Sequence, residues 1–433
     1  MQPPAELLQR LIRFDTTNPP GNERECVAWI EGLLRELGCE TRVLAKDPER
    51  PNLVARIPGE GSASPLLLQG HVDVVPTDDQ DWSRPPFEAH AEDGFIWGRG
   101  ALDMKGGVAM MLSAFMRAKS EGTALPGDVI FMAMSDEEAG SELGAKFLVD
   151  EHPELFDGVR YAIGEFGGFS IETAGRRLYP IMVAEKQVCW TRAVVRGPGG
   201  HGSLPVRGGA MARLARFLRN LDRKRLPVHV TPVVRQMVGA TAAAVPAPAS
   251  VALRGLLRPR LTDRLLDAMG ERGKLFDPLL HNTANATIVR GGGKINVIPG
   301  EIEVELDCRL LPGFGPEDLF AELGELAGEG IELEVLRFEA SSAEADMGML
   351  ESLGGVLREL DPSGTPIPLL LAAITDARVF DRLGIQTYGF LPMRLPAEMR
   401  FTELIHAADE RVPADTLEFG AEAIHRALRL PRP

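Results

Sequence analysis

The sequence predicts an α/β fold with two domains, because short apolar runs alternate with helical segments and three of these runs end in polar residues. Apolar residues recur at helical spacing over residues 4–14, 23–37 and 104–119. The apolar runs cover residues 66–68, 129–134 and 161–163, and they lead toward His71, residues 135–138 and Glu165. Ligands of an α/β sheet bind beyond the carboxyl ends of its strands. We therefore expect these polar residues to share one site.

A second domain is expected because the sequence pattern changes near the middle of the chain. The chain of 433 residues is long for a single core. Residues 301–308 alternate acidic and apolar side chains, which is typical of a strand with one face in water. We predict a small α+β domain inserted over residues 188–312 and a discontinuous main domain over residues 1–187 and 313–433. The segment 223–280 is rich in Pro and Ala, and no element is assigned to it.

The charge balance argues against partners that carry phosphate groups. With 47 Lys and Arg against 62 Asp and Glu, the formal net charge is −15. Binding to nucleic acid or to an anionic membrane needs clustered basic residues instead. We therefore expect a small-molecule substrate, no nucleic acid and no membrane.

Cysteine usage and the absence of targeting patterns predict a cytoplasmic protein. The four cysteines, at positions 26, 39, 189 and 308, match neither a zinc finger nor a disulfide framework. Reduced thiols are the simplest interpretation. The first ten residues lack the basic start and apolar core of a secretory signal. No stretch approaches the roughly 20 apolar residues of a membrane span.

His71 and Asp73 are the first candidates for a metal site. On an extended chain, residues two apart point to the same side, so the Asp73 carboxylate can approach the His71 ring. A carboxylate that accepts one imidazole N–H leaves the other ring nitrogen free for a metal. Taken alone, the pair is more typical of a partly buried histidine satisfied by a neighbouring aspartate.

Five residues together indicate zinc, although each has an ordinary structural alternative. Asp103 can cap a helix, Glu138 can lie in a first helical turn beside Glu137, and a lone Glu165 or His406 indicates little. The five candidate ligands are two histidines and three carboxylates: His71, Asp103, Glu138, Glu165 and His406. Imidazole nitrogen and carboxylate oxygen are typical zinc ligands. A bridging carboxylate holds two metals about 3.5–4 Å apart, as in aminopeptidases.

Several motifs resemble one family of enzymes along nearly the whole chain. The strongest are HVDVVP at 71–76, WGRGALDMKGG at 97–107, SDEEAG at 135–140 and GHGSLP at 200–205. Shorter matches are TNPPGN at 17–22, NVIP at 296–299, DCR at 307–309 and TDAR at 375–378. They resemble the aminoacylase, carboxypeptidase G and succinyl-diaminopimelate desuccinylase family of co-catalytic dizinc metallopeptidases, in its carboxypeptidase S-like branch. The resemblance implies a mixed-sheet α/β catalytic domain of the zinc-peptidase and phosphorylase type, with an inserted α+β lid or dimerisation domain.

The resemblance also divides the metal ligands between two zinc ions, for which Co²⁺ and Mn²⁺ are the alternatives. It assigns His71 and Glu165 to one ion, and Glu138 and His406 to the other. Asp103 is the implied bridge, and the Asp103–Met104 peptide is expected to be cis. Asp73 would orient His71. Glu137 would act as the general base that takes a proton from the bridging water and passes it to the leaving amine.

The remaining implied residues concern the substrate. His201 is expected to stabilise the oxyanion, often from a partner subunit, which implies a homodimer through the inserted domain. Asn296 and Arg309 match substrate contacts, and Arg309 suits a carboxylate clamp, although a salt bridge with Asp307 is an equal alternative. Thr375 and Arg378, with Asp376 between them, belong to a loop near the metals. In that loop Ala372, Ala373 and Ile374 replace the usual glycines, which leaves the pocket undefined.

These features predict an enzyme that cleaves the amide bond of a peptide or of an N-acyl amino acid. A metal-bridging hydroxide would attack the carbonyl, with Glu137 as the base. The alternatives are a specialised deacylase of the desuccinylase type and a non-catalytic zinc-binding descendant. The complete ligand set argues against the latter. The substrate, the native metal and the choice between monomer and dimer are left open.

Overall fold

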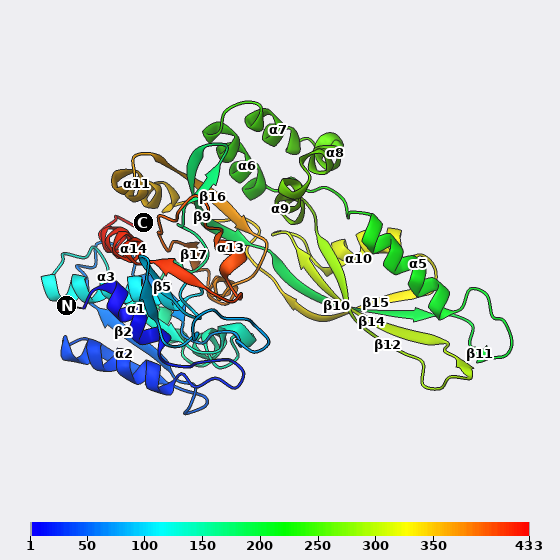
Figure 1. Ribbon diagram of the computed structural model, residues 1–433, viewed down its shortest axis with the longest axis horizontal. Helices are drawn as coiled ribbons and strands as arrows, with labels where there is room; N and C mark the ends of the chain where they lie inside the picture. The colour runs from blue at the N-terminus through cyan, green and yellow to red at the C-terminus, as the bar shows by residue number, and fades with distance from the viewer. Residues whose placement is uncertain (1, 433) are drawn as a thin grey trace.

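A mixed nine-stranded sheet forms the centre of the larger of two lobes (Figure 1) in the computed structural model, which describes residues 2–432. In spatial order its strands are β1 (Glu40–Leu44), β2 (Asn52–Ile57), β6 (Val129–Met134), β3 (Leu66–His71), β7 (Tyr161–Gly164), β17 (Gln386–Gly389), β9 (Arg176–Glu185) and β16 (Gly364–Leu371), with β8 (Ile171–Thr173) beside β9. The strands β6, β3, β7 and β17 are mutually parallel. The strand β2 pairs antiparallel with both β1 and β6, and β9 pairs antiparallel with β17. This architecture confirms the expected mixed-sheet α/β class.

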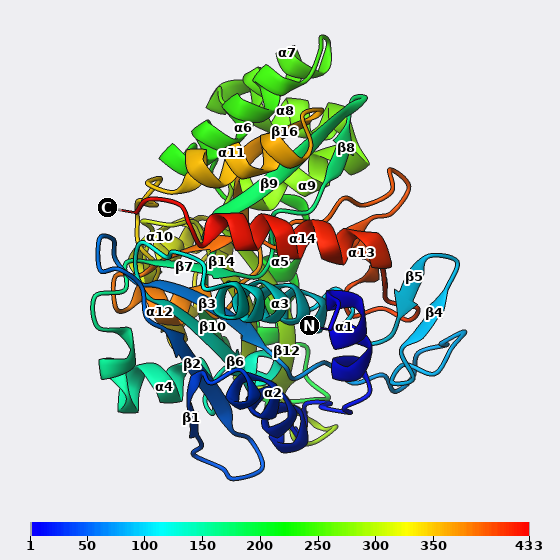
Figure 2. The same cartoon turned by 90° about the vertical axis from the view of Figure 1, so that its left-hand side faces the viewer.

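Helices cover both faces of this sheet, and for this reason its central strands are apolar at nearly every position. One face carries α1 (Pro4–Ile12), α2 (Arg24–Glu36), α3 (Lys105–Glu121), α11 (Leu350–Leu360) and α14 (Ala414–Ala427). The other face carries α4 (Ala145–Glu151), the 3-10 helix η2 (Pro153–Phe156) and α12 (Ala377–Asp381). Along β3, Leu66 and Leu68 pack into the first core and Leu67 packs into the second. Figure 2 shows α1, α3 and α14 side by side over the sheet.

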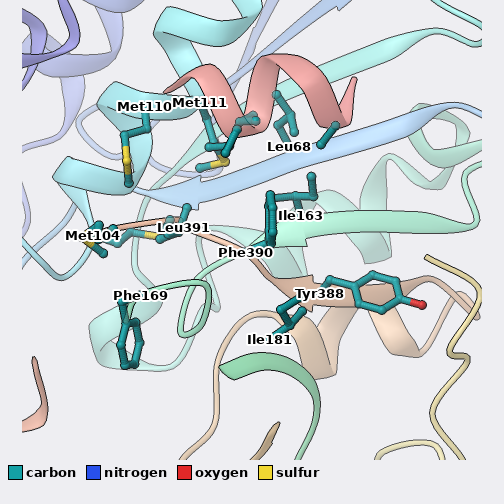
Figure 3. Close-up of a cluster of buried hydrophobic side chains, with 14 of the residues drawn as sticks. Leu68, Met104, Met110, Met111, Ile163, Phe169, Ile181, Tyr388, Phe390 and Leu391 are labelled. Atoms are coloured by element: carbon teal, nitrogen blue, oxygen red, sulfur yellow. The ribbon is translucent and has the colours of Figure 1, made fainter. Parts of the chain in front are cut away.

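The core beneath the end of β3 is closely packed. Leu68, Met104, Met111 and Leu391 are buried there (Figure 3). A Cβ atom on Gly70 would lie 2.7 Å from Met104 Cε and 2.9 Å from Met111 Cε. The strand that ends in His71 therefore has little freedom to shift relative to α3.

The smaller lobe, here called the outer lobe, contains a four-stranded antiparallel sheet in the order β12-β14-β10-β15. Its elements are β10 (Gln187–Arg196), β12 (Thr283–Gly291), β14 (Glu301–Leu310), β15 (Ile331–Glu339), α5 (Ala210–Arg223) and α10 (Pro316–Ala327), with a small ladder of β11 (Gly200–His201) and β13 (Val297–Ile298). In β14 the apolar side chains of Ile302, Val304 and Leu306 are buried in the core that this sheet shares with the two helices.

The outer lobe extends beyond the expected limits of 188–312, because α10 and β15 belong to it. The strand β15 pairs with the edge of β10 along most of its length. Gly313, where the sequence indicated the boundary, has a φ of 88° and forms only a turn before α10. The chain therefore enters the outer-lobe sheet at β10 and leaves it for the last time after Glu339.

Four helices occupy most of the segment that the sequence left unassigned. They are α6 (Pro232–Ala244), α7 (Ala249–Leu256), α8 (Pro259–Met269) and α9 (Glu271–Leu280). The helix α6 packs against β16 and β9, so this segment covers the edge of the main sheet although it lies within the insertion. Among residues 2–432, no helix combines the length and the apolar character that a membrane span requires. The four cysteines are all free and buried.

The packing behind the strand ends yields a stability prediction. A Cβ atom on Gly144, before α4, would lie 1.9 Å from the carbonyl oxygen of Ser135, which directly follows β6. Gly144→Ala should therefore lower the free energy of unfolding by about 1–3 kcal/mol, as overpacking does elsewhere. Urea denaturation measures this change.

The matched control is Gly32→Ala, since a Cβ on Gly32 in α2 meets nothing within 4 Å. Removing a helical glycine should stabilise the protein by about 0.5–1 kcal/mol. Equal effects of the two substitutions would contradict the packing described here.

Candidate metal centre and active site

The parallel strands deliver three candidate ligands to one edge of the main sheet. His71 is the last residue of β3, and Glu165 directly follows β7. Glu137 and Glu138 lie in the 3-10 helix η1 (Glu137–Ala139), just after β6. The three strands are parallel, so their carboxyl ends meet at the same edge. This convergence is the one that the sequence pattern predicted.

Asp103 and His406 come to the same edge from loops. Asp103 lies between β5 (Phe95–Trp97) and α3, and β5 belongs to a small sheet with β4 (His90–Glu92) and β18 (Arg411–Pro413). His406 follows the short helix α13 (Phe401–Leu404) and has a φ of 59°, a left-handed conformation that is uncommon for a residue with a side chain. The Asp103–Met104 peptide is cis, which confirms the expectation.

The Asp103 carboxylate lies between the two histidines. Its Oδ1 is 3.3 Å from His71 Nε2, and its Oδ2 is 3.3 Å from His406 Nε2. Glu165 Oε2 lies on the His71 side, 3.6 Å from Nε2. Glu138 Oε1 lies on the other side, 3.4 Å from His406 Nε2. Each histidine thus has one oxygen of Asp103 and one further carboxylate beside it.

The other nitrogen of His71 is oriented by the backbone. His71 Nδ1 is 3.0 Å from the carbonyl oxygen of Asp73, whereas the nearest carboxylate oxygen of Asp73 is 3.5 Å away. A carbonyl only accepts hydrogen bonds, so Nδ1 carries the proton and Nε2 presents its lone pair to the cluster.

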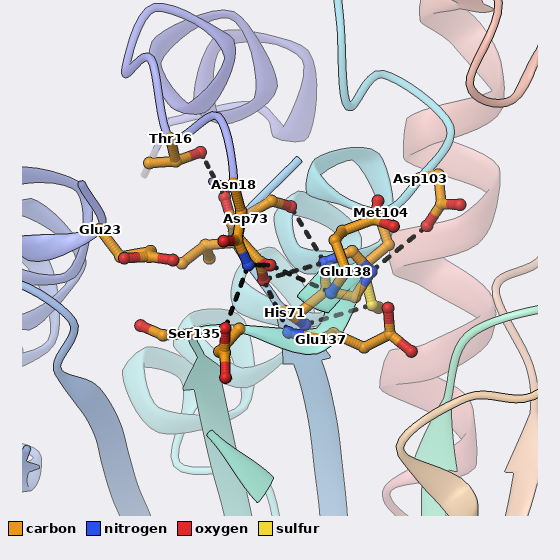
Figure 4. A network of polar contacts seen from close by, with 12 residues as sticks. Thr16, Asn18, Glu23, His71, Asp73, Asp103, Met104, Ser135, Glu137 and Glu138 are labelled. Atoms are coloured by element: carbon orange, nitrogen blue, oxygen red, sulfur yellow. Dashed lines mark hydrogen bonds and ion pairs between the residues drawn. The ribbon is translucent and has the colours of Figure 1, made fainter. Parts of the chain in front are cut away.

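The Asp73 carboxylate instead holds the loop that carries Glu137 and Glu138. Its Oδ1 accepts from the Glu137 N–H, and its Oδ2 accepts from the Glu138 N–H, both at 3.1 Å. Asn18 Nδ2 donates to the same Oδ2 at 2.8 Å. Figure 4 shows Asp73 between Asn18 and the Glu137–Glu138 pair. Asn18 belongs to a motif noted in the sequence, but this contact depends on the fold and was missed.

Burial of these carboxylates disfavours their ionised forms, and a bound cation would offset this desolvation cost. Burial raises the pKa of Glu165 to about 7, although the nearby His71 ring acts to lower it. Burial, together with the negative charge of Glu165, raises the pKa of Glu137 well above its usual range. In contrast, the neighbouring carboxylates of Asp103 and Glu138 raise the pKa of His406 to about 10. The site therefore concentrates negative charge where solvent does not compensate it.

The donor set fits metal ions. The ligand atoms of His71, Asp103 and Glu138 lie within 4.8 Å of one another, and so do those of His71, Glu137 and Glu165. Glu138 Oε1 is buried and has no hydrogen-bond partner among the described residues. The His406 side chain is 49% exposed, so the cluster opens to solvent on that side. Such a cluster of oxygen and imidazole donors is a candidate metal centre that a small substrate can reach.

Glu410 is a residue that sequence reasoning missed, and it holds the Asp103 loop in place. It is fully buried, and its Oε2 accepts from Arg99 Nη1 at 2.6 Å and from the Gly100 N–H at 3.2 Å. Its Oε1 accepts from the N–H groups of Leu102 and Asp103, at 2.7 and 3.1 Å. One carboxylate thus binds the whole turn before Asp103. A single acid four residues after His406 gives no such signal in the sequence.

Two expected site residues lie far from the metal centre. His201 is exposed on β11, where its Nδ1 is 2.7 Å from Ser203 Oγ. Asn296 is its neighbour, since the Asn296 carbonyl accepts from the Gly202 N–H. Figure 1 shows β11 at the far end of the outer lobe, opposite α13. Within one chain, the structure does not bring these two residues to the ligands.

The other expected substrate contacts are engaged within the protein. Arg309 makes a bidentate ion pair with Asp307, with N–O distances of 2.8 and 3.1 Å. This geometry is the salt bridge that the sequence left as an alternative. The Thr375 side chain is buried and donates to Glu185 Oε2. Arg378 is 6% exposed, and its guanidinium contacts Glu339, Ser141 and the Thr375 carbonyl.

Known proteins share both the sequence pattern and the fold of this chain. A family model described as peptidase family M20/M25/M40 matches residues 67–430. Aminoacylase-1 from Sus scrofa is 26% identical over 420 residues, which cover 95% of this chain and 90% of that protein. The probable carboxypeptidase S-like 2 from Dictyostelium discoideum is 27% identical over 383 residues, with coverage of 81% and 68%. The M20 family metallo-carboxypeptidase Sso-CP2 from Sulfolobus solfataricus has a TM-score of 0.71 at 19% identity and 99% coverage of both chains.

The fold, the cluster and these similarities define the protein as a hydrolase of the metallopeptidase class. The chain belongs to peptidase family M20/M25/M40. The family and the enzyme class expected from the motifs are thereby confirmed.

The contacts of Glu410 yield a prediction about metal affinity. All four groups that contact the Glu410 carboxylate are hydrogen-bond donors. In Glu410→Gln, one carboxylate oxygen is replaced by an NH₂ group, which cannot accept from them. The loop that carries Asp103 would therefore lose part of its support. We expect the metal affinity to fall by about 10–100-fold, as for other groups that orient ligands. Competition with a fluorescent chelator measures this affinity.

The control is Glu403→Gln, which changes an exposed acid near His406 that pairs with Arg400. It should leave the metal affinity unchanged. A Glu410→Gln variant that is folded by circular dichroism and binds metal as tightly as the wild type would disprove the role of Glu410.

Proposed function

We propose that the protein is a zinc-dependent hydrolase that cleaves the amide bond of a peptide or of an N-acyl amino acid. The observation that carries this proposal is the position of Asp103, with one oxygen toward each of two histidines. Each histidine has a further carboxylate beside it, which suits a pair of ions. The relatives named aminoacylase-1 and carboxypeptidase S-like 2 support the amide substrate class.

Two Zn²⁺ ions are the proposed cofactors, and Co²⁺ or Mn²⁺ would accept the same donors. His71 and Glu165 would hold one ion, Glu138 and His406 the other, and Asp103 would be shared. When bound, such ions polarise a carbonyl group and lower the pKa of a water molecule.

Glu137 is the proposed general base. Its main chain is held by Asp73, and its carboxylate lies within 4.8 Å of the ligand atoms of His71 and Glu165. A base must lie within hydrogen-bond reach of the proton it accepts. Glu137 therefore accepts a proton from the attacking water and delivers it to the leaving amine.

The outer lobe supplies the remaining groups in this proposal. His201 and Asn296 lie together at its tip, so we place them at the active site of a partner subunit in a homodimer formed through this lobe. There the His201 ring would donate to the oxyanion. Arg309 would bind a substrate carboxylate after exchanging its partner Asp307, and Thr375 would line the pocket. The free, buried cysteines fit the cytoplasmic compartment expected from the sequence.

A turnover screen tests the proposed reaction. Zinc-loaded protein is offered dipeptides, N-acyl amino acids and succinylated amines, and free amine is quantified. We expect turnover of at least one of these classes, and Glu137→Gln should reduce kcat by at least about 100-fold, the size of a general-base contribution.

The control for Glu137→Gln is Glu142→Gln in the same loop, because Glu142 is exposed and pairs with Lys146. It should retain full activity and metal content. An active Glu137→Gln variant would exclude Glu137 as the base. Absence of both bound metal and turnover in the wild type would favour a non-catalytic descendant.

His201→Ala yields a prediction about subunit cooperation. This substitution should lower kcat by about 10²–10³-fold through loss of an oxyanion donor, while metal content stays unchanged. Mixing His201→Ala with Glu137→Gln subunits should restore part of the activity, because a mixed dimer has one site with both groups.

The exposed His90, which pairs with Glu88, serves as the control through His90→Ala. It should change neither quantity. Full activity of His201→Ala, or no recovery after mixing, would overturn the proposed contribution from the partner.

A further inference from the structure

The first and the last connection between the two lobes contact the same short segment of the larger lobe. On the outgoing side, Glu185 ends β9, and its Oε2 accepts from the N–H and the hydroxyl of Thr375, at 2.8 and 2.9 Å. On the returning side, Glu339 ends β15, and its Oε2 accepts from Arg378 Nε at 2.7 Å. The segment 375–378 is therefore joined to the chain just before β10 and to the end of β15.

The same arginine also contacts the loop that carries Glu137. Arg378 Nη2 donates to Ser141 Oγ at 3.2 Å, and the Ser141 hydroxyl donates to Asp376 Oδ1. The Ser141 N–H donates to the Asp136 carbonyl at 2.6 Å, which closes the loop around Glu137 and Glu138. A continuous chain of contacts thus runs from the outer-lobe strand β15 to the loop that carries the proposed base.

A small cavity at this junction gives its side chains room to change partners. It has a volume of about 40 Å³, and Glu185, Ser341, Arg378 and Thr387 are among its lining residues. Three polar atoms of these residues, Glu185 Oε1, Ser341 Oγ and Thr387 Oγ1, are buried without a hydrogen-bond partner among the described residues. Close packing elsewhere in the core leaves no comparable freedom around His71. The junction is therefore suited to a change of angle between the lobes.

We propose that Arg378 is a positioning residue that couples the angle of the outer lobe to the placement of Glu137, through Glu339 on one side and Ser141 on the other. The inference rests on the proposed function, in which the outer lobe delivers groups to a metal centre. The guanidinium is planar and rigid, so a displacement of the Glu339 carboxylate either turns the whole group or breaks a buried ion pair. Either event changes the support of Ser141 and thereby of the Glu137 loop.

Neighbouring cations favour the ionised form of the Glu339 carboxylate. Burial acts to raise the pKa of Glu339, but hydrogen bonds from Arg337 and Lys146 and the charge of Arg378 outweigh it and lower this pKa to about 2. Lys146 Nζ lies 2.9 Å from Glu339 Oε1, so a second group of the larger lobe contacts the same carboxylate. The coupling is thus mechanical and does not depend on a change of protonation.

The alternative is that Arg378 contacts the substrate directly, as the resemblance implied. Its buried position and its three protein partners disfavour that role, because a substrate would first have to displace Glu339. The two roles differ in kinetics. A substrate clamp raises KM when it is weakened, whereas a residue that positions the base lowers kcat.

Glu339→Gln in the metal-loaded enzyme tests the coupling without altering the metal ligands or the base. We expect unchanged metal content, a kcat lower by about tenfold and a KM within about threefold of the wild-type value. Glu334→Gln is the matched control, because Glu334 lies on the same strand β15 and pairs with Arg192 inside the outer lobe. It should leave kcat unchanged.

Arg378→Lys, which keeps the charge but not the planar group, should lower kcat as Glu339→Gln does. The kcat of the double variant should be little lower than that of either single variant, because both substitutions interrupt the same coupling.

A distance measurement supplies a readout that does not require turnover. Spin labels on Lys46→Cys in the larger lobe and Lys294→Cys in the outer lobe report the angle between the lobes, since both positions are exposed and the native cysteines are buried. Glu339→Gln should broaden the distance distribution relative to the wild type and to Glu334→Gln. Wild-type kcat and an unchanged distribution in Glu339→Gln and Arg378→Lys would overturn the inference, as would an increase in KM alone. A wild-type enzyme without turnover would instead count against the proposed function, while the distances would still decide the coupling.

Discussion

Buried negative charge at one edge of the main sheet governs the architecture around it. Asp103, Glu138 and Glu165 surround two imidazoles, with Glu137 beside them and little solvent to compensate their charge. Ionised carboxylates are expensive to bury without a partner, so such a site is stable only when cations or protons balance it. The parallel strands bring the ligands together, because their carboxyl ends lie at the same edge of the sheet and no long loops are needed.

The ligands that come from loops need separate support, and two buried carboxylates provide it. Asp73 accepts hydrogen bonds from the N–H groups of Glu137 and Glu138, and Glu410 accepts them from the turn before Asp103. Neither acid is a proposed ligand. Both convert flexible backbone into a fixed frame, which reduces the reorganisation needed when a metal or a substrate binds. The metal centre therefore depends on a larger set of acids than the ligands themselves.

The two lobes divide the chemistry. The larger lobe carries the metal centre and the proposed base, whereas His201 and Asn296 lie at the tip of the outer lobe. Rigid strands β10 and β15 join this tip to the junction at segment 375–378, where Arg378 contacts the outer lobe and the loop of Glu137. A hydrolase built in this way can make the position of its base depend on the position of the lobe that completes its site.

The sequence by itself determined the α/β class, the convergence of His71, Glu138 and Glu165 and the family, because strand ends and motifs are local patterns along the chain. It also determined the cis peptide after Asp103 through the family motif. Only the tertiary structure decided that Glu410 holds the Asp103 loop, that the Asp73 carboxylate binds backbone N–H groups and that β15 belongs to the outer lobe. These features join residues that are distant in the sequence, such as Glu410 and Asp103. The sequence also does not distinguish a glutamate that will be buried from one that will be exposed to solvent. The tertiary structure likewise decided which groups the Arg378 guanidinium contacts, since Glu339, Ser141 and Thr375 come from separate parts of the chain.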